Sequence, residues 1–393
     1  MDNQPTDCVL HNIKIWDGNN ERQEDALLIE NGKIVALGEA ADFREHNNHR
    51  DMAGLSVLPG LIDAHVHLEL NPDDAKPPEK TLPSVIPLMQ ERAAQMAQCG
   101  ITTARDLGGG AWFELELRKR IQTRELVGPR LLCSGQPITS VQGHCHFWGG
   151  EAANTEQALE VAQRQVDKNV DLIKVMATGG RLTRGSEPTD GQFPQTTLDA
   201  IVDFAHQHNL PVAAHCHGTH GIHQAAIAGV DTIEHCSWVG KEGWASDYQE
   251  EVAKVILDQG VWISPTVNKG WQRMLDSKTG NVLKRVRQAY RAMLDMGIPM
   301  LASTDAGIPG VYHNELAHAL VVFAKIAQLS NEEALKSATS DAALALRINH
   351  TTGTIQANLD ADLLVVDGNP LADLSAITKP VMTFCRGMQV NPT

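Results

Sequence analysis

Residues 61–67 read Leu-Ile-Asp-Ala-His-Val-His, a short and mainly apolar run that ends in two histidines separated by one residue. Alternate side chains of a β-strand point to the same side, so His65 and His67 at the end of such a strand can face one metal ion. A single His-x-His pair is weak evidence alone. Whether it marks a metal site depends on the rest of the chain.

Seven further strand-like runs follow, and segments with helical periodicity separate them. Leu198, Ile201 and Val202, for example, have the spacing of the buried face of an amphipathic helix. This alternation predicts a parallel sheet, and eight repeats match the (β/α)8 TIM barrel, whose active site lies at the carboxyl ends of the strands. The expected strands are 61–67, 101–106, 130–134, 171–176, 211–215, 231–235, 261–265 and 299–304.

The two ends of the chain differ from this middle part. Residues 8–57 contain strand-like runs separated by turn sequences such as Asp17-Gly18-Asn19, and residues 353–390 repeat the pattern. We therefore expect a small β-sandwich domain built from residues 1–58 and 353–393. The TIM-barrel catalytic domain, residues 59–352, would be inserted between them.

The charge of the chain restricts its partners. Lysine and arginine total 33 against 48 aspartate and glutamate, a formal net charge of -15, and no basic run stands out. We expect no nucleic-acid partner and no membrane partner. Residues 1–18 lack the pattern of a secretory signal, so a cytoplasmic location is expected. The seven cysteines are scattered without a Cys-x-x-Cys pair, which argues against a disulfide framework and against a thiolate zinc cluster. Cys145, Cys216 and Cys236, each close to a histidine, are expected to be small buried residues that line the barrel.

Side chains that bind metals or transfer protons lie at or near the ends of four more expected strands. They are Lys174, His215, His235 and Asp305. Each has an ordinary alternative: a hydrogen-bonded core histidine for His215, a helix N-cap for Asp305, or a solvated charge for Lys174. Their joint placement at one end of a barrel, beside the His-x-His pair, favours a metal centre.

Lys174 needs a separate explanation, because it lies inside the apolar run 172–176. An unpaired ammonium group is costly to bury. An ammonium group also cannot bind a cation, so a direct role at a metal requires a modified nitrogen. Reaction with carbon dioxide would convert the amine to a carbamate, which can bridge two ions.

These motifs, in this order, resemble the amidohydrolase superfamily over essentially the whole chain. The resemblance is carried by residues 59–67, 173–180, 214–218, 233–235, 304–305, 353–355, 361–363 and 367–371. Within the superfamily the chain is most similar to the imidazolonepropionase-related group, which includes Xaa-Pro dipeptidases and arginine or lysine carboxypeptidases. The resemblance implies two divalent ions, zinc by preference. His65, His67 and Asp305 would bind one, His215 and His235 the other, and carboxylated Lys174 would bridge them.

The resemblance also implies a reaction on a small-molecule substrate. A water held by the two ions becomes hydroxide near neutral pH and attacks the carbonyl of an N-acyl amino acid, a dipeptide or a related amide. Asp305 takes the proton of this water and passes it to the leaving nitrogen. His144 and His217 match histidines that face the substrate. Arg181 and Arg184, in the loop 179–192, can pair with a substrate carboxylate or can simply be solvated.

One segment departs from the peptidase pattern. Residues 145–150 read Cys-His-Phe-Trp-Gly-Gly, where the peptidase members have small acidic or polar residues. Phe147 and Trp148 would suit a flatter or more apolar acyl group than a dipeptide has, and core packing explains them equally well.

Two other functional classes share this fold. A mononuclear deaminase or cyclic-amide hydrolase generally lacks the lysine on the fourth strand, and a non-enzymatic barrel would be free to lose a ligand. Iron, manganese, cobalt or nickel can occupy the same kind of site as zinc. Many relatives associate, so a homo-oligomer is compatible with the resemblance.

Overall fold

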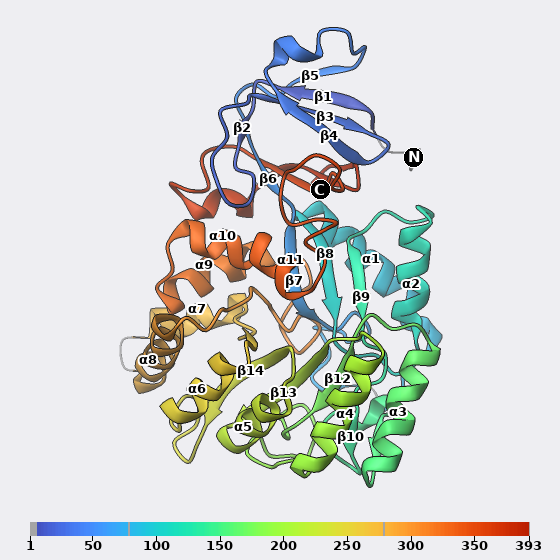
Figure 1. Cartoon of the computed structure of the whole chain (residues 1–393), viewed down its shortest axis with the longest axis vertical. Coiled ribbons are helices and arrows are strands. Elements are labelled where there is room, and N and C mark those ends of the chain that lie inside the picture. Colours follow the sequence, from blue (N-terminus) through green and yellow to red (C-terminus); the bar gives the residue numbers. More distant parts are fainter. Residues whose placement is uncertain (1–5, 78, 278–279, 393) are drawn as a thin grey trace.

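The computed structural model describes residues 6–77, 79–277 and 280–392, and strands from both ends of the chain lie together in its β-rich part (Figure 1). One sheet, in the order β18-β17-β16-β6-β2, contains strands from both ends. They are β2 (Lys14–Ile15), β6 (Ser56–Pro59), β16 (Leu363–Val366), β17 (Pro380–Cys385) and β18 (Met388–Val390). The antiparallel pair β6 and β16 places Leu58 opposite Leu364. This pairing joins segments about 300 positions apart by backbone hydrogen bonds, the interaction that defines a sheet.

A second sheet, in the order β4-β3-β1-β5, comes from the N-terminal part alone. Its strands are β1 (Cys8–His11), β3 (Ala26–Glu30), β4 (Lys33–Gly38) and β5 (His49–Asp51). Leu10 and Ile29 from this sheet are buried in one apolar cluster with Val57, Val365 and Phe384 from the first sheet. Burial of apolar surface between the two sheets stabilises their association.

The middle of the chain contains parallel strands. One sheet consists of β7 (Leu61–Val66), β8 (Ile101–Asp106) and β9 (Arg130–Cys133). Another consists of β12 (Ile173–Met176), β13 (Val212–Gly218), β14 (Thr232–Val239) and β15 (Trp262–Ser264). All neighbours within these two sheets pair in parallel, and their order follows the sequence. Seven of the eight expected strands are therefore present at the expected places.

Backbone hydrogen bonds also connect these sheets to one another. Asp171 N donates to Cys133 O at 2.9 Å, and Ile138 N donates to Lys174 O at 2.9 Å, which joins the β9 side to β12. On the far side, Leu301 N donates to Ile263 O at 2.8 Å, and His67 N donates to Ala306 O at 2.7 Å. The hydrogen bonds thus lead from β7 through the other strands and back to β7.

The expected eighth strand, 299–304, is the element that differs. It forms a single bridge, between Met300 and Ile263, and the next bridge is between Ala306 and Val66. Pro299 has no N–H to donate. Asp305 has a left-handed backbone, with φ of 62°, which interrupts an extended conformation. A continuous ladder therefore does not form here, although the segment occupies the expected position between β15 and β7.

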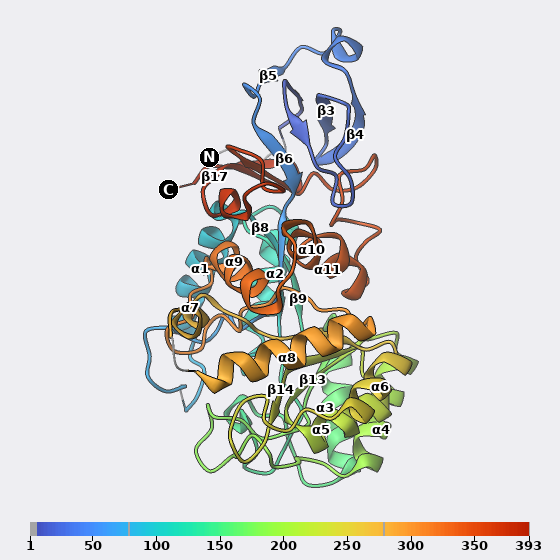
Figure 2. The same ribbon diagram turned by 90° about the vertical axis from the view of Figure 1, so that its left-hand side faces the viewer.

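Helices separate the parallel strands and lie outside them (Figures 1 and 2). In the expected helix α4, Leu198, Ile201 and Val202 are buried. Asn154 caps α3 by accepting a hydrogen bond from Gln157 N at 3.0 Å. The helices are α1 (Ile86–Gln98), α2 (Phe113–Gln122), α3 (Thr155–Asp167), α4 (Gln195–Gln207), α5 (Thr219–Ala228), α6 (Glu250–Asp258), α7 (Gln272–Asp276), α8 (Asn281–Met296), α9 (Leu316–Ala327), α10 (Asn331–Ser337) and α11 (Ser340–Ala345).

Short elements complete the description. The pair β10 (Thr139–Ser140) and β11 (Glu151–Ala152) brackets the segment that departs from the peptidase pattern. The 3-10 helices are η1 (Ala40–Phe43), η2 (Pro83–Val85), η3 (His146–Trp148), η4 (Lys269–Trp271) and η5 (Leu374–Thr378). No helix within the described ranges combines the length and the apolar character that crossing a bilayer requires.

Candidate metal centre and active site

The first group of metal-ligand side chains joins the end of β7 to the segment after residue 304. His65 Nε2 lies 3.3 Å from His67 Nε2, and Asp305 Oδ1 lies 3.3 Å and 3.5 Å from these two nitrogens. Two ligand atoms bound tetrahedrally to one zinc ion at about 2.0–2.1 Å are about 3.3 Å apart. The three atoms are therefore spaced as ligands of one ion would be.

A second group lies at the ends of β13 and β14. His215, His217 and His235 are all buried, and their ligand atoms lie within 4.8 Å of one another. The ring of His235 stacks on that of His217 at 4.6 Å and lies 4.5 Å from that of His215. We expected His215 and His235 as ligands and His217 as a substrate contact. The structure brings all three within reach of one ion.

One ring nitrogen of each of these five histidines is engaged by a partner in the protein. The partners are Glu234 Oε2 for His65 Nδ1, Gly108 O for His67 Nδ1, Gly179 O for His215 Nε2, Ser237 Oγ for His217 Nδ1 and Thr266 Oγ1 for His235 Nδ1, at 2.8–3.2 Å. A carbonyl or carboxylate partner requires the N–H on that nitrogen, which leaves the other nitrogen unprotonated. Metal-binding histidines are typically oriented in this way.

Burial keeps most of these imidazoles neutral. It lowers the pKa of His65 to about 4 and that of His217 to about 3, and it holds the pKa values of His215 and His235 well below the usual value. A metal ion binds neutral imidazole, so no proton has to be removed before binding near neutral pH.

Asp305 and His235 both have left-handed backbones, with φ of 62° and 66°. Residues other than glycine pay for this conformation in free energy, and such residues concentrate at functional sites. Burial raises the pKa of Asp305, but His65 and His67 lower it by more, so the carboxyl stays ionised. Asp63 positions this segment by accepting a hydrogen bond from Thr304 Oγ1 at 2.7 Å.

Lys174 lines the same cavity as both histidine groups. Its side chain is 1% exposed, and Nζ has no hydrogen-bond partner among the described residues. Burial lowers the pKa of Lys174 to about 8. A buried amine with this pKa is partly uncharged near neutral pH, the state in which an amine reacts with carbon dioxide.

Glu234 and Arg105 complete the base of the site and were not singled out from the sequence. Arg105 Nη2 lies 2.7 Å from Glu234 Oε1, and Arg105 also donates to Ala64 O and Thr232 Oγ1. Burial raises the pKa of Glu234, but Arg105 and the hydrogen bond from His65 lower it by more. In the sequence Arg105 and Glu234 are charged residues inside two of the expected strands, 101–106 and 231–235, and Glu234 also stands in the segment 233–235.

The cavity above these groups has a volume of about 1050 Å³. His144 lies on its wall, with its ring 4.5 Å from that of His215 and with Nδ1 unpartnered among the described residues. Arg181 and Arg184 are exposed at its rim. All four residues expected to contact the substrate, His144, His217, Arg181 and Arg184, therefore line one cavity.

The segment that departs from the peptidase pattern divides between two environments. Trp148 is buried and packs against the ring of His67 at 4.9 Å, so it belongs to the core. Phe147 is partly exposed and lines the cavity. Cys145 and Cys216 are free and buried, as expected, and so is Cys236.

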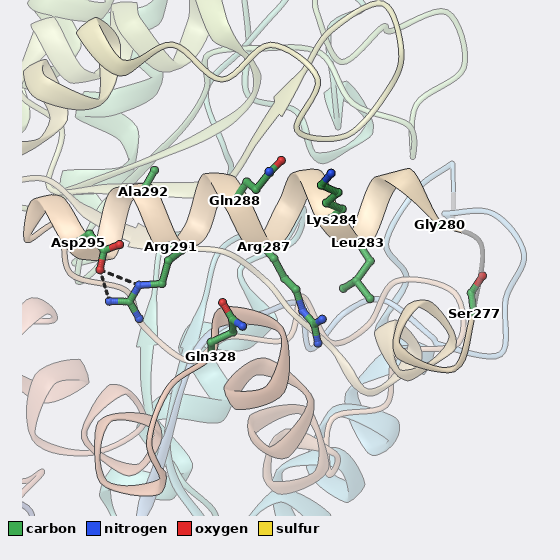
Figure 3. Close-up of a pocket in the computed structure, with 10 residues that line it drawn as sticks. All are labelled: Ser277, Gly280, Leu283, Lys284, Arg287, Gln288, Arg291, Ala292, Asp295 and Gln328. Atoms are coloured by element: carbon green, nitrogen blue, oxygen red, sulfur yellow. Dashed lines mark hydrogen bonds and ion pairs between the residues drawn. The ribbon is translucent and has the colours of Figure 1, made fainter.

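A second hollow, of about 620 Å³, lies along α8 (Figure 3). It shares no lining residue with the first cavity. Arg287 and Gln328 point into it, while Arg291 is bound to Asp295 (Figure 3). Neither of the two metal-capable groups found among the described residues lies there. The larger cavity is therefore the candidate active site.

The chain is similar to known proteins over most of its length. Residues 56–390 match the model of the amidohydrolase family. The chain is 27% identical to ochratoxinase of Aspergillus niger, over 92% of this chain and 82% of that protein. It is 21% identical to imidazolonepropionase of Nocardia farcinica, over 88% of this chain and 86% of that protein.

Solved structures share the fold. The crystal structure of a Xaa-Pro dipeptidase with bound methionine matches with a TM-score of 0.87 and 24% identity, over 98% of this chain and 100% of that chain. The crystal structure of A. niger ochratoxinase matches with a TM-score of 0.82 and 23% identity, over 99% of this chain and 96% of that chain. With a family match across 56–390 and this arrangement of histidines, the chain belongs to the amidohydrolase family.

Proposed function

We propose that the protein is a metal-dependent hydrolase that cleaves an amide bond of a small molecule, namely an N-acyl amino acid, a dipeptide or a related amide. The observation that carries this proposal is the pair of three-residue metal-capable groups on the wall of one cavity. Membership of the amidohydrolase family supports hydrolysis of a bond between carbon and nitrogen.

The proposed ligands follow from the geometry and the donor chemistry. His65, His67 and Asp305 would hold one divalent ion, and His215 and His235 would hold the second. Lys174 would join the two after its amine forms a bond with the carbon of carbon dioxide and releases a proton. Imidazole and carboxylate ligands suit zinc.

When bound, the ions would polarise the scissile carbonyl and lower the pKa of water. Asp305 would accept the proton that the attacking water loses and deliver it to the leaving nitrogen as the carbon–nitrogen bond breaks. Its lowered pKa keeps the carboxyl group ionised at neutral pH, so that its oxygens are free to accept a proton. His144, with its unpartnered Nδ1, and His217 would orient the substrate from the cavity wall, and Arg181 and Arg184 would act at the rim.

The architecture that supports this site is also part of the proposal. We assign the parallel strands and their helices to a (β/α)8 TIM barrel of residues 59–352. We assign residues 1–58 and 353–393 to one β-sandwich domain. The order and direction of the strands support both assignments.

The test combines metal analysis with hydrolysis. The protein is prepared with bicarbonate and zinc, metal per chain is measured, and N-acyl amino acids and dipeptides are assayed. Lys174→Met preserves the volume of the buried side chain, and Lys254→Met, at an exposed position on α6, is the matched control. We expect about two ions per chain, and loss of one ion and of hydrolysis in Lys174→Met only.

Other outcomes would contradict the proposal. About one ion per chain that is unaffected by Lys174→Met would favour a mononuclear deaminase or cyclic-amide hydrolase. A protein that binds no metal and hydrolyses none of the substrates would favour a non-catalytic barrel.

A further inference from the structure

The rim of the cavity carries an arginine that forms no ion pair with any carboxylate in the described part of the chain. Arg181 is exposed in the loop between β12 and α4, and its guanidinium carbon lies 5.7 Å from the centre of a Trp244 ring. A cation stacked on tryptophan is held by the charge distribution of the ring. Among the described residues no carboxylate pairs with Arg181, so its donors remain available for a ligand.

Trp244 links this arginine to the metal-capable histidines. Its ring lies edge to face with that of His217 at 5.0 Å, and it approaches Trp271 at 6.4 Å. The sequence of contacts from Arg181 to Trp244 to His217 therefore runs from the rim to the base of the cavity. A substrate bound across it would have its scissile bond at the histidines and its far end at the guanidinium.

The charges on the cavity wall favour an anionic substrate. Apart from Lys174 and Asp305, the charged lining residues are Lys76, Arg181, Arg184, Glu79 and Glu151. Three cations thus face two carboxylates, in a chain with a formal net charge of -15. A cationic rim on an acidic protein attracts anions to the cavity.

The same wall offers flat apolar surface. Phe147, Trp244 and Trp271 line the cavity beside Leu182 and Ile308. Aromatic side chains bury large areas and stack on flat groups. Among cationic side chains, arginine suits carboxylate recognition because it donates two parallel hydrogen bonds. Binding the carboxylate at the rim also keeps it away from metal ions, where it would compete with the scissile carbonyl.

We propose that Arg181, held on Trp244, binds a carboxylate of the substrate, and that the protein prefers amides carrying both a free carboxylate and a flat apolar group. This inference rests on the proposed amide hydrolysis and narrows its substrate class. Neutral amides would bind without the anchor and would be poorer substrates. Arg181 is thereby a specificity-determining residue that acts on the far end of the substrate.

The experiment compares two substrates that differ only in the carboxylate: 4-(benzoylamino)butanoic acid and 4-(benzoylamino)butanamide. Both carry a flat benzoyl group on the scissile amide, and three methylene groups separate that amide from the carboxylate or its neutral replacement, as an anchor at the far end of the substrate requires. The ratio of their kcat/KM values, acid over amide, is measured for the metal-loaded wild type and variants. We expect the wild type to prefer the acid by about 10- to 100-fold, the range of a charge-assisted hydrogen-bonded pair. Arg181→Gln should lower this ratio at least tenfold, mainly through KM for the acid, and Arg181→Lys should give an intermediate ratio.

Two further variants test the arrangement. Trp244→Leu removes the stacking surface and should lower the ratio, and Trp244→Phe should restore part of it. The matched control is Arg273→Gln, because Arg273 is exposed on α7 outside the cavity lining. Metal content and melting temperature are measured on each variant, so that misfolding is recognised directly.

The outcomes separate this inference from the proposed function. If the wild type hydrolyses neither compound nor any other amide tested, the proposed function fails. If it hydrolyses amides but does not prefer the acid, or if Arg181→Gln keeps the wild-type ratio, the proposed function stands. The inference that Arg181 binds a substrate carboxylate is then wrong. A lowered ratio in Arg184→Gln, with none in Arg181→Gln, would also overturn the assignment to Arg181.

Discussion

Glu234 Oε2 accepts a hydrogen bond from His65 Nδ1 at 2.8 Å, and both side chains are buried. The second oxygen of Glu234 accepts hydrogen bonds from Arg105 and Thr232. The carboxylate therefore connects β14 to β7 and β8 beneath the candidate metal centre. It sets the tautomer and orientation of a candidate ligand, while Arg105 balances its charge.

Glu234→Gln should weaken metal binding at the group formed by His65, His67 and Asp305. The amide keeps the shape of the side chain but loses the charge that holds the N–H of His65. We expect the affinity of this group for zinc to fall by about 10- to 100-fold. Competition against a chelator of known affinity measures this change, and Glu250→Gln, at the exposed start of α6, is the control. Equal affinities in wild type and Glu234→Gln would show that Glu234 has no role in orienting the ligand.

The ion pair between Arg105 and Glu234 also predicts that replacing Arg105 destabilises the protein. Arg105→Met leaves the Glu234 carboxylate buried without its cation. Removing one partner of a buried ion pair typically costs about 3–5 kcal/mol. We expect the free energy of unfolding, from urea denaturation of the metal-free protein, to decrease by this amount. A loss below about 1 kcal/mol would mean that water or another group compensates Glu234.

His217→Gln distinguishes two roles for this histidine. We proposed that it contacts the substrate, yet its ring lies within ligand distance of His215 and His235. With Lys174 as the bridging ligand, His217→Gln should retain two ions per chain and lower kcat/KM about 100-fold, within the range that positioned acid–base and orienting groups contribute. Loss of one ion in His217→Gln, with two retained in Lys174→Met, would make His217 the ligand and remove the need for a carbamate.

The parts of the site that could be expected from sequence are those set by strand geometry. His65 and His67 alternate on one strand, and parallel strands end at the same edge, so candidate ligands from β7, β13 and β14 could be expected to meet. The position of Asp305 followed the same logic, although its strand did not form as expected. The repeat of side-chain direction every two residues in a strand, and every 3.6 residues in a helix, was enough to predict these features.

Features that depend on contacts across the fold could not be expected. Arg105 and Glu234 are 129 positions apart, and no local pattern pairs them. The stacking of Arg181 on Trp244 depends on the conformations of two separate loops. The burial of Trp148 against His67, with Phe147 at the cavity, also required the backbone, because Cys145 and Gly149 both have left-handed conformations that turn this segment.

Trp148→Ala and Phe147→Ala should therefore have different effects. Trp148 is 1% exposed and supports the ring of His67, so its truncation should cost about 3–5 kcal/mol of the free energy of unfolding. Phe147 is partly exposed at the cavity, so its truncation should cost less than about 1.5 kcal/mol and mainly raise KM for substrates with a flat acyl group. Thermal or urea unfolding with steady-state kinetics measures both. Equal stability losses would place Phe147 in the core as well.

His144→Gln should change how stability depends on pH. Burial lowers the pKa of His144 to about 3, whereas a histidine in an unfolded chain titrates near 6.5. Below pH 6.5 the unfolded wild type therefore binds a proton that the folded protein does not, so its free energy of unfolding falls as pH falls. Glutamine has no such proton. Between pH 7.5 and 5 the stability of metal-free His144→Gln should improve relative to wild type by about 2 kcal/mol, from about 1.4 kcal/mol per pH unit below 6.5. Between pH 7.5 and 8.5 the difference should stay constant, which provides an internal control. If the difference in free energy of unfolding between His144→Gln and wild type stays constant down to pH 5, His144 accepts a proton in the folded state. The interpretation of His144 as a neutral imidazole on the cavity wall would then be wrong.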